Sequence, residues 1–414
     1  MPIHCRLPTA EIYSKLRLGV RSKVSEGDIL KVNQIAALRR DHFPVFERRA
    51  YLNSCSQGAL ATEVRAAYDL YLDQLEEFGS LWETWVGIQE DVRDQLAQVF
   101  TTQTDQVAIT TSASAAVNAI ASCFDFRKGP RKVLTTSLEF PTIGQIWHAQ
   151  ERNGAEVVHI AADPDNRLPA ERIAAAIDGN TAIVSVTHGC YRNGAMNDIK
   201  AIVKAAHDQG VPVLIDAYQT SGAVPINFEE LGADFLVGGV LKYMLSSPGV
   251  GFALVNNQTV SEFVPTTTGW FAARDIHSME IDRFDPAKDA RRFEAGTPTV
   301  PSLYAAQAGL KLLLEVGVEN AWAVSSQLHD QLRAGVSELG GICATPDGPG
   351  EHGPMLAVVS TDEPALVYAM EQDNVVVSGR DGNVRVSPHF YNNSDDIEAA
   401  LASMSKNRIL LATS

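Results

Sequence analysis

Short apolar runs rich in β-branched residues alternate with segments of helical spacing through the first two thirds of the chain. The runs lie near residues 107, 133, 157, 183, 213, 235 and 252. Most are apolar at every position, as expected for strands that are buried on both faces of a sheet. Intervening segments such as 141–154 and 196–210 have helical spacing and end in Gly, a common helix stop. The alternation predicts an α/β fold in which helices cover a mainly parallel sheet.

The pattern changes after about residue 256. A polar, irregular stretch with scattered aromatic residues is followed by a helix-like run over 301–340 and then by short apolar runs between helical segments. Because the chain has 414 residues, two packed domains are expected rather than one. We predict an N-terminal extension over 1–50, a large domain over 51–300 and a smaller α+β domain over 301–414.

Charge and composition restrict the partners that this chain can have. The formal net charge is −16 and the pI is near 5.1, so nucleic acid and anionic membrane surfaces would be repelled. No segment reaches the ~20 apolar residues of a membrane span, and no targeting segment is evident. The five cysteines are scattered and contain no CxxC pair: Cys5, Cys55, Cys123, Cys190 and Cys343. Neither a disulfide framework nor a zinc site is indicated, and a reducing cytoplasm fits best.

Two segments of the predicted sheet carry polar residues where a ligand would bind. Ser112 and Ser114 lie between a strand and an Ala-rich helix, where backbone N–H groups and the helix dipole favour a phosphate. Taken alone, an ordinary helix cap is the favoured interpretation, because the segment is neither a Walker loop nor a GxGxxG. Asp216 ends a buried strand and Gln219 follows three residues later. A turn cap and a ligand-binding carboxylate are about equally supported there.

Lys242 lies between two apolar runs, in the segment "DFLVGGVLKYMLSSPGVGFALV" of residues 234–255. Most lysines extend their amine to the surface, but these flanks favour burial. Burial lowers the pKa of an amine, which leaves it free to form a Schiff base with an aldehyde. A phosphate site, a carboxylate and a nucleophilic amine therefore follow one another along the predicted sheet.

This combination resembles the fold type I enzymes that use pyridoxal 5'-phosphate (PLP), specifically the aminotransferase class V group. That group contains kynureninases, cysteine desulfurases and isopenicillin N epimerases. The resemblance extends from "YLNSCSQGAL" at residue 51 to "VRVSPHFYN" near residue 392. Its most specific part is D-x-x-[HQ] followed by a lysine before a loop that contains Gly and Pro. In this chain the motif is Asp216, Gln219 and Lys242.

The resemblance implies roles for several residues in a PLP site. Lys242 would form the Schiff base with the cofactor, Asp216 would keep the pyridine nitrogen protonated, and Gln219 would bond near the phenolic oxygen. Further cofactor-binding positions are implied at Ser112, Ala113 and Ser114 for the phosphate, Phe140 for stacking on the ring, and Thr297, which would reach the phosphate from the neighbouring subunit. The chain is therefore expected to form a homodimer whose active sites are shared across the interface.

Substrate-binding positions follow from the same resemblance. Arg385 matches the arginine that holds the α-carboxylate of an amino-acid substrate, a task suited to its bidentate geometry. Trp270 lies where the family places an aromatic ring near the substrate side chain. Tyr191 lies in a segment that runs beneath the cofactor in relatives, and Ser56 lies on a loop that approaches the substrate. Arg192 is a candidate for a second anionic group of the substrate, although an ordinary surface arginine is the more common case.

The reaction is less constrained than the cofactor. Residues 375–385 contain no cysteine, which disfavours persulfide-forming desulfurase chemistry. Kynureninases have Tyr where this chain has Leu241, and His where it has Gln219. A lyase that cleaves at Cβ of an L-α-amino acid is our leading hypothesis, with an aminotransferase or an epimerase as alternatives. A non-catalytic PLP-binding module is the alternative of another class, and a nicotinamide-dependent oxidoreductase is less well supported.

Overall fold

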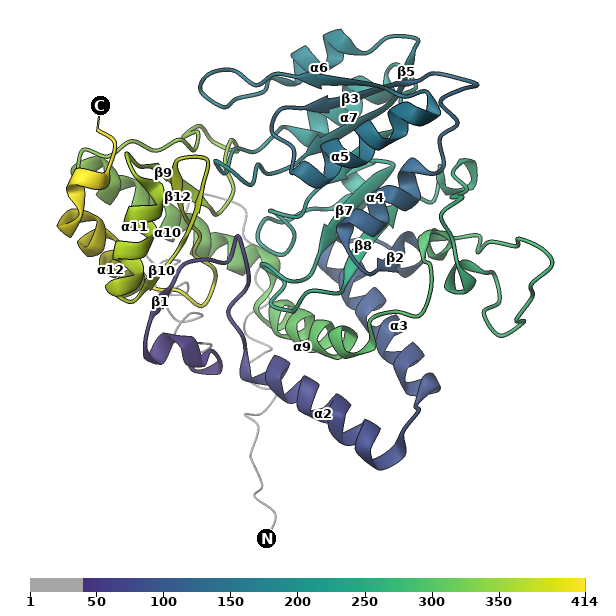
Figure 1. The fold of residues 1–414 in the computed structure, drawn as a ribbon, viewed down its shortest axis with the longest axis horizontal. Coiled ribbons are helices and arrows are strands. Elements are labelled where there is room, and N and C mark those ends of the chain that lie inside the picture. The colour runs from purple at the N-terminus through teal and green to yellow at the C-terminus, as the bar shows by residue number, and fades with distance from the viewer. Residues whose placement is uncertain (1–39, 414) are drawn as a thin grey trace.

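The computed structural model describes residues 40–413, so most of the predicted N-terminal extension, together with Cys5, lies outside the described residues. Seven strands form the main sheet in the order β2-β8-β7-β6-β5-β3-β4 (Figure 1). Their bounds are β2 (Val107–Thr110), β3 (Lys132–Thr136), β4 (Glu156–Ile160), β5 (Thr181–Thr187), β6 (Val213–Asp216), β7 (Phe235–Gly239) and β8 (Gly251–Val255). All seven coincide with predicted runs. Strand β8 is antiparallel to both of its neighbours, and every other pairing in the sheet is parallel.

Two helical layers cover the faces of this sheet, because successive strand residues point to opposite sides. In β6, Val213 and Ile215 join one apolar core, whereas Leu214 joins the other. The Leu214 core includes helices α4 (Ala113–Ala121) and α5 (Pro141–Ala149). The opposite core includes α3 (Trp82–Val99), α6 (Ala170–Ala176), α7 (Ile199–His207) and α9 (Val300–Val316). These two layers confirm the predicted α/β class.

The C-terminal elements form a second lobe beside the main sheet (Figure 1). A three-stranded antiparallel sheet in the order β11-β12-β9 lies there with three helices. The elements are α10 (Val318–Glu338), β9 (Leu356–Val359), α11 (Glu363–Gln372), β10 (Val375–Val376), β11 (Ser378–Arg380), β12 (Asn383–Val386) and α12 (Ser394–Lys406). Figure 1 shows α9 running between this lobe and the sheet lobe.

The first described residues pack against the C-terminal lobe. Strand β1 (Ala50–Tyr51) pairs in parallel with β10, and Arg40 forms an ion pair with Asp396 at 2.7 Å. The chain then forms α2 (Thr62–Phe78) and α3 before it enters the sheet at β2. Helices α2 and α3 are not among the predicted elements. The short helix α8 (Phe228–Leu231) precedes β7. No helix among residues 40–413 is long and apolar enough to cross a membrane.

Candidate active site

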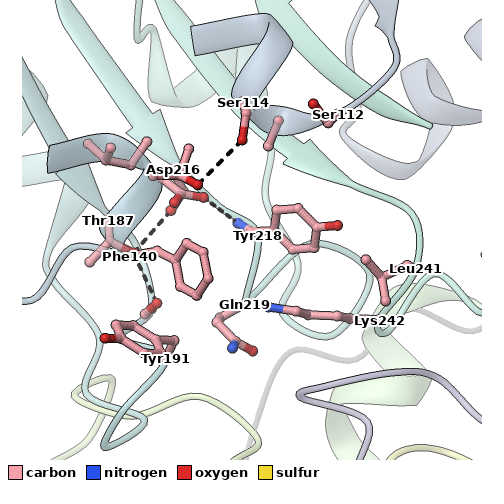
Figure 2. Close-up of a pocket in the computed structure, with 14 residues that line it drawn as sticks. Ser112, Ser114, Phe140, Thr187, Tyr191, Asp216, Tyr218, Gln219, Leu241 and Lys242 are labelled. Atoms are coloured by element: carbon pink, nitrogen blue, oxygen red, sulfur yellow. Dashed lines mark hydrogen bonds between the residues drawn. The ribbon is translucent and has the colours of Figure 1, made fainter. Parts of the chain in front are cut away.

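A cavity of about 260 Å³ opens at the carboxyl ends of the central strands, next to the first turns of α4 and α5 (Figure 2). Thr187 ends β5 and Asp216 ends β6, and Lys242 follows β7. Ligands of open α/β sheets bind at this edge. The lining comprises Ser112, Ala113, Ser114, Phe140, Thr142, Ile143, Thr187, Gly189, Tyr191, Asp216, Tyr218, Gln219, Leu241 and Lys242.

Lys242 extends into this cavity from the loop between β7 and β8 (Figure 2). Burial lowers the pKa of its amine to about 8; the neighbouring Cys55 and Asp216 oppose this shift, and Arg385 adds to it. The amine makes no hydrogen bond or ion pair with residues 40–413. It lies instead over the ring of Tyr218, 4.4 Å from the centroid. A desolvated, unpartnered amine is suited to covalent attachment of an aldehyde.

Residues 53–58 hold the backbone of the lysine loop in place. The N–H of Gly58 donates to the carbonyl oxygen of Leu241 at 3.0 Å, and the Gln57 amide donates to the same oxygen at 3.0 Å. A Cβ at Gly58 would lie 2.3 Å from the carbonyl oxygen of Lys242, so only glycine permits this approach. The lysine is therefore positioned by a segment almost 200 residues earlier in the sequence.

Asp216 and Gln219 line the same cavity as Lys242, and both are buried. The Tyr218 N–H donates to Asp216 Oδ1 at 2.9 Å. Burial raises the pKa of Asp216, while this hydrogen bond and the charge of Lys242 lower it. The Gln219 amide donates to the carbonyl oxygen of Cys55 at 3.2 Å, and its Oε1 is buried without a partner. Both side chains thus retain bonding capacity for a ligand.

Helix α4 directs its N-terminus at the cavity. Ser112 caps the helix by accepting from the N–H of Ala115 at 3.1 Å, which leaves the N–H groups of Ala113 and Ser114 without a partner in the described chain. A Cβ at Gly251 in β8 would lie 2.3 Å from the carbonyl carbon of Ser112, so this glycine lets the helix start close to the sheet. Free N–H groups and the helix dipole favour an anion here.

Aromatic rings form one wall of the cavity. Phe140 immediately precedes α5 and contacts Tyr191 edge to face, with 4.9 Å between the ring centroids. The Phe140 ring is 43% exposed, which is unusual for a large apolar side chain beside a buried cluster. Figure 2 shows it directed into the cavity. A flat ligand between this wall and Asp216 would cover its exposed surface.

Arg385 brings three predicted substrate positions together. It lies in β12 and is 3% exposed, and it donates to the carbonyl oxygen of Tyr191 at 2.8 Å and to Ser378 Oγ at 2.9 Å. Ser56 Oγ is 3.5 Å from the same guanidinium group. The Nε of Arg385 is buried without a partner. Arg385 belongs to the C-terminal lobe, and its hydrogen bond to Tyr191, a lining residue, connects it to the edge of the cavity.

Five predicted residues lie outside the cavity lining: Arg385 and Ser56, described above, and Arg192, Trp270 and Thr297. Arg192 pairs with Asp381 at 3.5 Å and donates to the carbonyl oxygen of Ser137. Trp270 packs edge to face on Trp82, with 6.0 Å between centroids. Thr297 is exposed in the loop before α9.

Three residues close to the site are not among the sequence predictions. Tyr218 lies within the Asp216–Gln219 motif, and Thr187 is the last residue of the strand that pairs with the strand of Asp216. Their positions at the ends of neighbouring strands are the sequence signal by which they could have been predicted. Glu139 is fully buried, and burial raises its pKa to about 8. Its Oε1 accepts from Thr136 Oγ1 at 2.6 Å and from the Thr187 N–H at 2.9 Å. Nothing in the sequence distinguishes Glu139 from an exposed glutamate.

The lining fits pyridoxal phosphate on four observations. A free amine, Lys242, matches its aldehyde, and the free N–H groups of α4 match its phosphate. A buried carboxylate, Asp216, matches its ring nitrogen, and the exposed Phe140 face matches its flat ring. When bound, this cofactor supplies an electron sink for reactions at the substrate Cα.

Comparisons with known proteins agree with this site. The sequence model of the family described as "Aminotransferase class-V" matches residues 76–399. The uncharacterized aminotransferase YcbU of Bacillus subtilis strain 168 is 32% identical over 364 residues, which cover 87% of this chain and 95% of that protein. A kynureninase of Geobacillus thermodenitrificans is 24% identical, with 86% and 88% of the two chains covered.

The fold is similar to that of solved structures. A cysteine desulfurase of Thermococcus onnurineus NA1 superposes with a TM-score of 0.80 at 20% identity, covering 90% of this chain and 97% of the other. At that identity the likeness concerns the fold alone. The family model and the 32% identical relative show that the chain belongs to the aminotransferase class-V family of fold type I enzymes, whose cofactor is pyridoxal 5'-phosphate.

Proposed function

We propose that this protein is a lyase that cleaves a bond at Cβ of an L-α-amino acid. The observation that carries the proposal is the free, desolvated amine of Lys242, which lines one cavity together with Asp216 and is influenced by the charge of Arg385. A base with a pKa near the working pH is suited to moving the Cα proton. The relationship to a kynureninase supports the lyase.

We assign the cofactor end of the cavity to the residues already described. Lys242 holds the aldehyde carbon, and Asp216 keeps the ring nitrogen protonated. Gln219 donates to the phenolic oxygen through the second N–H of its amide group, since the other N–H donates to the carbonyl oxygen of Cys55. Phe140 stacks on the ring. Ser112, Ala113 and Ser114 hold the phosphate at the start of α4, supported by the free N–H groups there.

We assign substrate recognition to Arg385 and its neighbours. Its buried guanidinium group, with an unpartnered Nε, would pair with the α-carboxylate and fix the Cα proton toward Lys242. Ser56 and Tyr191 position this guanidinium group through the contacts described above. Arg192 and Trp270 would reach the substrate side chain only after a change in their present contacts.

We further propose a homodimer in the cytoplasm. Large apolar side chains are exposed around α2 and the start of α3, notably Leu70, Leu72, Phe78 and Trp82, and Trp270 adjoins them. Several large exposed apolar side chains in one region are typical of a protein interface. Thr297, which is exposed in its own subunit, would complete the phosphate site of the partner.

The four described cysteines are free thiols, which fits a reducing compartment.

Product analysis with a panel of L-α-amino acids tests the proposed reaction. The lyase is supported if a side-chain fragment separates from a three-carbon product, and if Lys242→Ala abolishes its formation. An oxo acid with an intact side chain, formed with pyridoxamine phosphate, would replace the lyase by an aminotransferase, which the name of the 32% identical relative favours. Recovery of only the opposite enantiomer would replace it by an epimerase. Absence of turnover across the panel would favour a binding module.

A further inference from the structure

Tyr218 occupies the centre of the cavity without a defined partner for its hydroxyl group. Its ring lies over the Lys242 amine, and its backbone N–H bonds Asp216. The side chain lines the same cavity as Ser112, Ser114 and Leu241. No residue among 40–413 forms a hydrogen bond with the Tyr218 hydroxyl. Figure 2 shows this hydroxyl directed toward the side of the cavity where Ser112 and Leu241 lie.

Gly239, the last residue of β7, makes room for this hydroxyl. A Cβ at Gly239 would lie 2.5 Å from Tyr218 Oη and 2.6 Å from Cζ, so any other residue there would displace the ring. The hydroxyl therefore rests directly against the end of β7. The backbone of Gly239 is itself held in place, because β7 pairs with β6 on one side and with β8 on the other.

The pairing of β7 with β8 places the hydroxyl beside the start of α4. Gly239 is the direct partner of Gly251 in this antiparallel pair. A Cβ at Gly251 would lie 2.6 Å from the Ala113 nitrogen. Paired residues of an antiparallel ladder point to the same face, with Cβ positions ~4.5–5.5 Å apart. These two paired glycines thus place the Tyr218 hydroxyl and the first N–H of α4 at the same end and on the same face of the sheet.

The chemistry of the surroundings makes this hydroxyl a donor to an anion. Burial and the charge of Asp216 raise the pKa of Tyr218 well above its ordinary value, so the phenol keeps its proton. Leu241, on the same side of the cavity, has no polar atom to offer. The Tyr218 hydroxyl is thus available as a donor, on this side of the cavity, to an anion held at Ala113 and Ser114.

We propose that Tyr218 is a cofactor-binding residue whose hydroxyl donates a hydrogen bond to the phosphate group of pyridoxal phosphate. This inference rests on the proposed placement of the phosphate at residues 112–114. Gly239 is then a specificity-determining position, because its missing side chain is what admits the tyrosine.

Binding of two ligands to the apo-protein tests the proposal: pyridoxal phosphate, and pyridoxal, which lacks the phosphate. Tyr218→Phe removes only the hydroxyl and keeps the ring over Lys242. The variant should bind pyridoxal phosphate roughly 10-fold more weakly, because it loses one hydrogen bond to a charged group. Its affinity for pyridoxal should be unchanged. Equal weakening of both ligands, or of neither, would overturn the proposal. Tyr243→Phe is the matched control, since this buried tyrosine adjoins Lys242 but does not line the cavity.

Two further variants separate this inference from the phosphate placement itself. Ser114→Ala should also weaken the binding of pyridoxal phosphate selectively; if it does not while Tyr218→Phe does, the Ser114 hydroxyl is not a phosphate ligand and the role of Tyr218 stands. In a Tyr218→Ala background, Gly239→Ser should recover selective binding of the phosphorylated ligand, because it returns a hydroxyl to the same place. Gly239→Ser alone should weaken binding, because its Cβ collides with the Tyr218 ring. Failure of the double variant to exceed Tyr218→Ala would count against the proposal.

Discussion

The amine of Lys242 lies over the aromatic face of Tyr218, 4.4 Å from the ring centroid. Such contact favours the charged amine by ~0.5–2 kcal/mol. Desolvation acts in the opposite direction and is larger, because the net effect is a pKa of about 8 instead of 10.5. That difference corresponds to about 3 kcal/mol against the charged form.

The lowered pKa of Lys242 predicts how fast the apo-protein captures its cofactor. Only the uncharged amine attacks an aldehyde, so the capture rate should rise with pH and level off with a midpoint near pH 8. Stopped-flow absorbance, recorded from about pH 6 to about pH 10, measures this capture rate. A midpoint near the ordinary lysine value of 10.5 would show that the amine is solvated.

Replacement of Arg385 should affect substrates that carry an α-carboxylate. Arg385→Lys keeps the charge but loses the bidentate geometry, so we expect KM to rise about 100-fold, equivalent to about 3 kcal/mol. Amines that lack the carboxylate should bind the variant and the parent protein equally. Arg333→Lys is the control, because Arg333 is also partly buried and also donates to carbonyl oxygens, those of Thr345 and Pro346. A similar rise in KM for the control would mean that the effect is structural.

Glu139 should be a neutral acid in the folded protein near neutral pH. Burial raises its pKa to about 8 from 4.5, so the folded state binds more protons than the unfolded state between these values. Its contribution to stability is present below pH 4.5 and is lost as pH rises through 8. In urea unfolding, the free energy of unfolding of the parent should fall by on the order of a few kcal/mol between about pH 6 and about pH 9. Glu139→Gln mimics the protonated group, so this fall should be smaller in the variant. An unchanged pH slope in the variant would show that Glu139 is ionised when folded.

His329 should destabilise the fold in acid. It is fully buried in α10 and stacks on His352, and both of its ring nitrogens lack hydrogen-bond partners among residues 40–413. Burial lowers its pKa to about 4 from 6.5; the nearby Asp330 opposes the shift, and His352 and Arg333 add to it. Its neutral form therefore supports the fold above pH 6.5, and this support is lost as pH falls toward 4.

A comparison of His329→Leu with the parent protein measures that contribution. Between pH 7 and pH 5 the parent should lose about 2 kcal/mol more stability than the variant, from the difference between the folded and unfolded pKa values. His277→Leu, at an exposed histidine in the loop after η7 (Trp270–Ala272), should leave the pH dependence unchanged. Equal losses in the parent and His329→Leu would show that this imidazole is solvated or already charged.

The sequence predicts the main sheet well, because its strands are buried on both faces and read as continuous apolar runs. Burial in β5 and β6 extends to every residue, which produces this pattern. The exposed helix α2 escapes prediction because only Val64 of its residues is buried. The pairing of β1 with β10 escapes it for another reason: two residues at each end of a long chain carry no periodicity.

The site is predictable where a local motif sets it. Asp216, Gln219 and Lys242 lie together in one cavity as the D-x-x-Q spacing and the following lysine indicate. The contribution of Tyr218 depends on the absence of a side chain at Gly239, a contact between two strands that sequence spacing does not reveal. Trp270 and Arg192 were placed by resemblance alone, and the packing of their own neighbours holds them away from the cavity lining.

Peptide mapping locates the lysine to which the cofactor is covalently attached, which we expect to be Lys242. The protein is loaded with pyridoxal phosphate, reduced with borohydride and digested, and the peptide that carries the added mass is sequenced by mass spectrometry. We expect the mass on Lys242, with none on the exposed Lys204, and we expect Lys242→Ala to lose both the mass and the visible absorbance of the loaded protein. The added mass on another lysine, or retention of that absorbance in Lys242→Ala, would contradict the account.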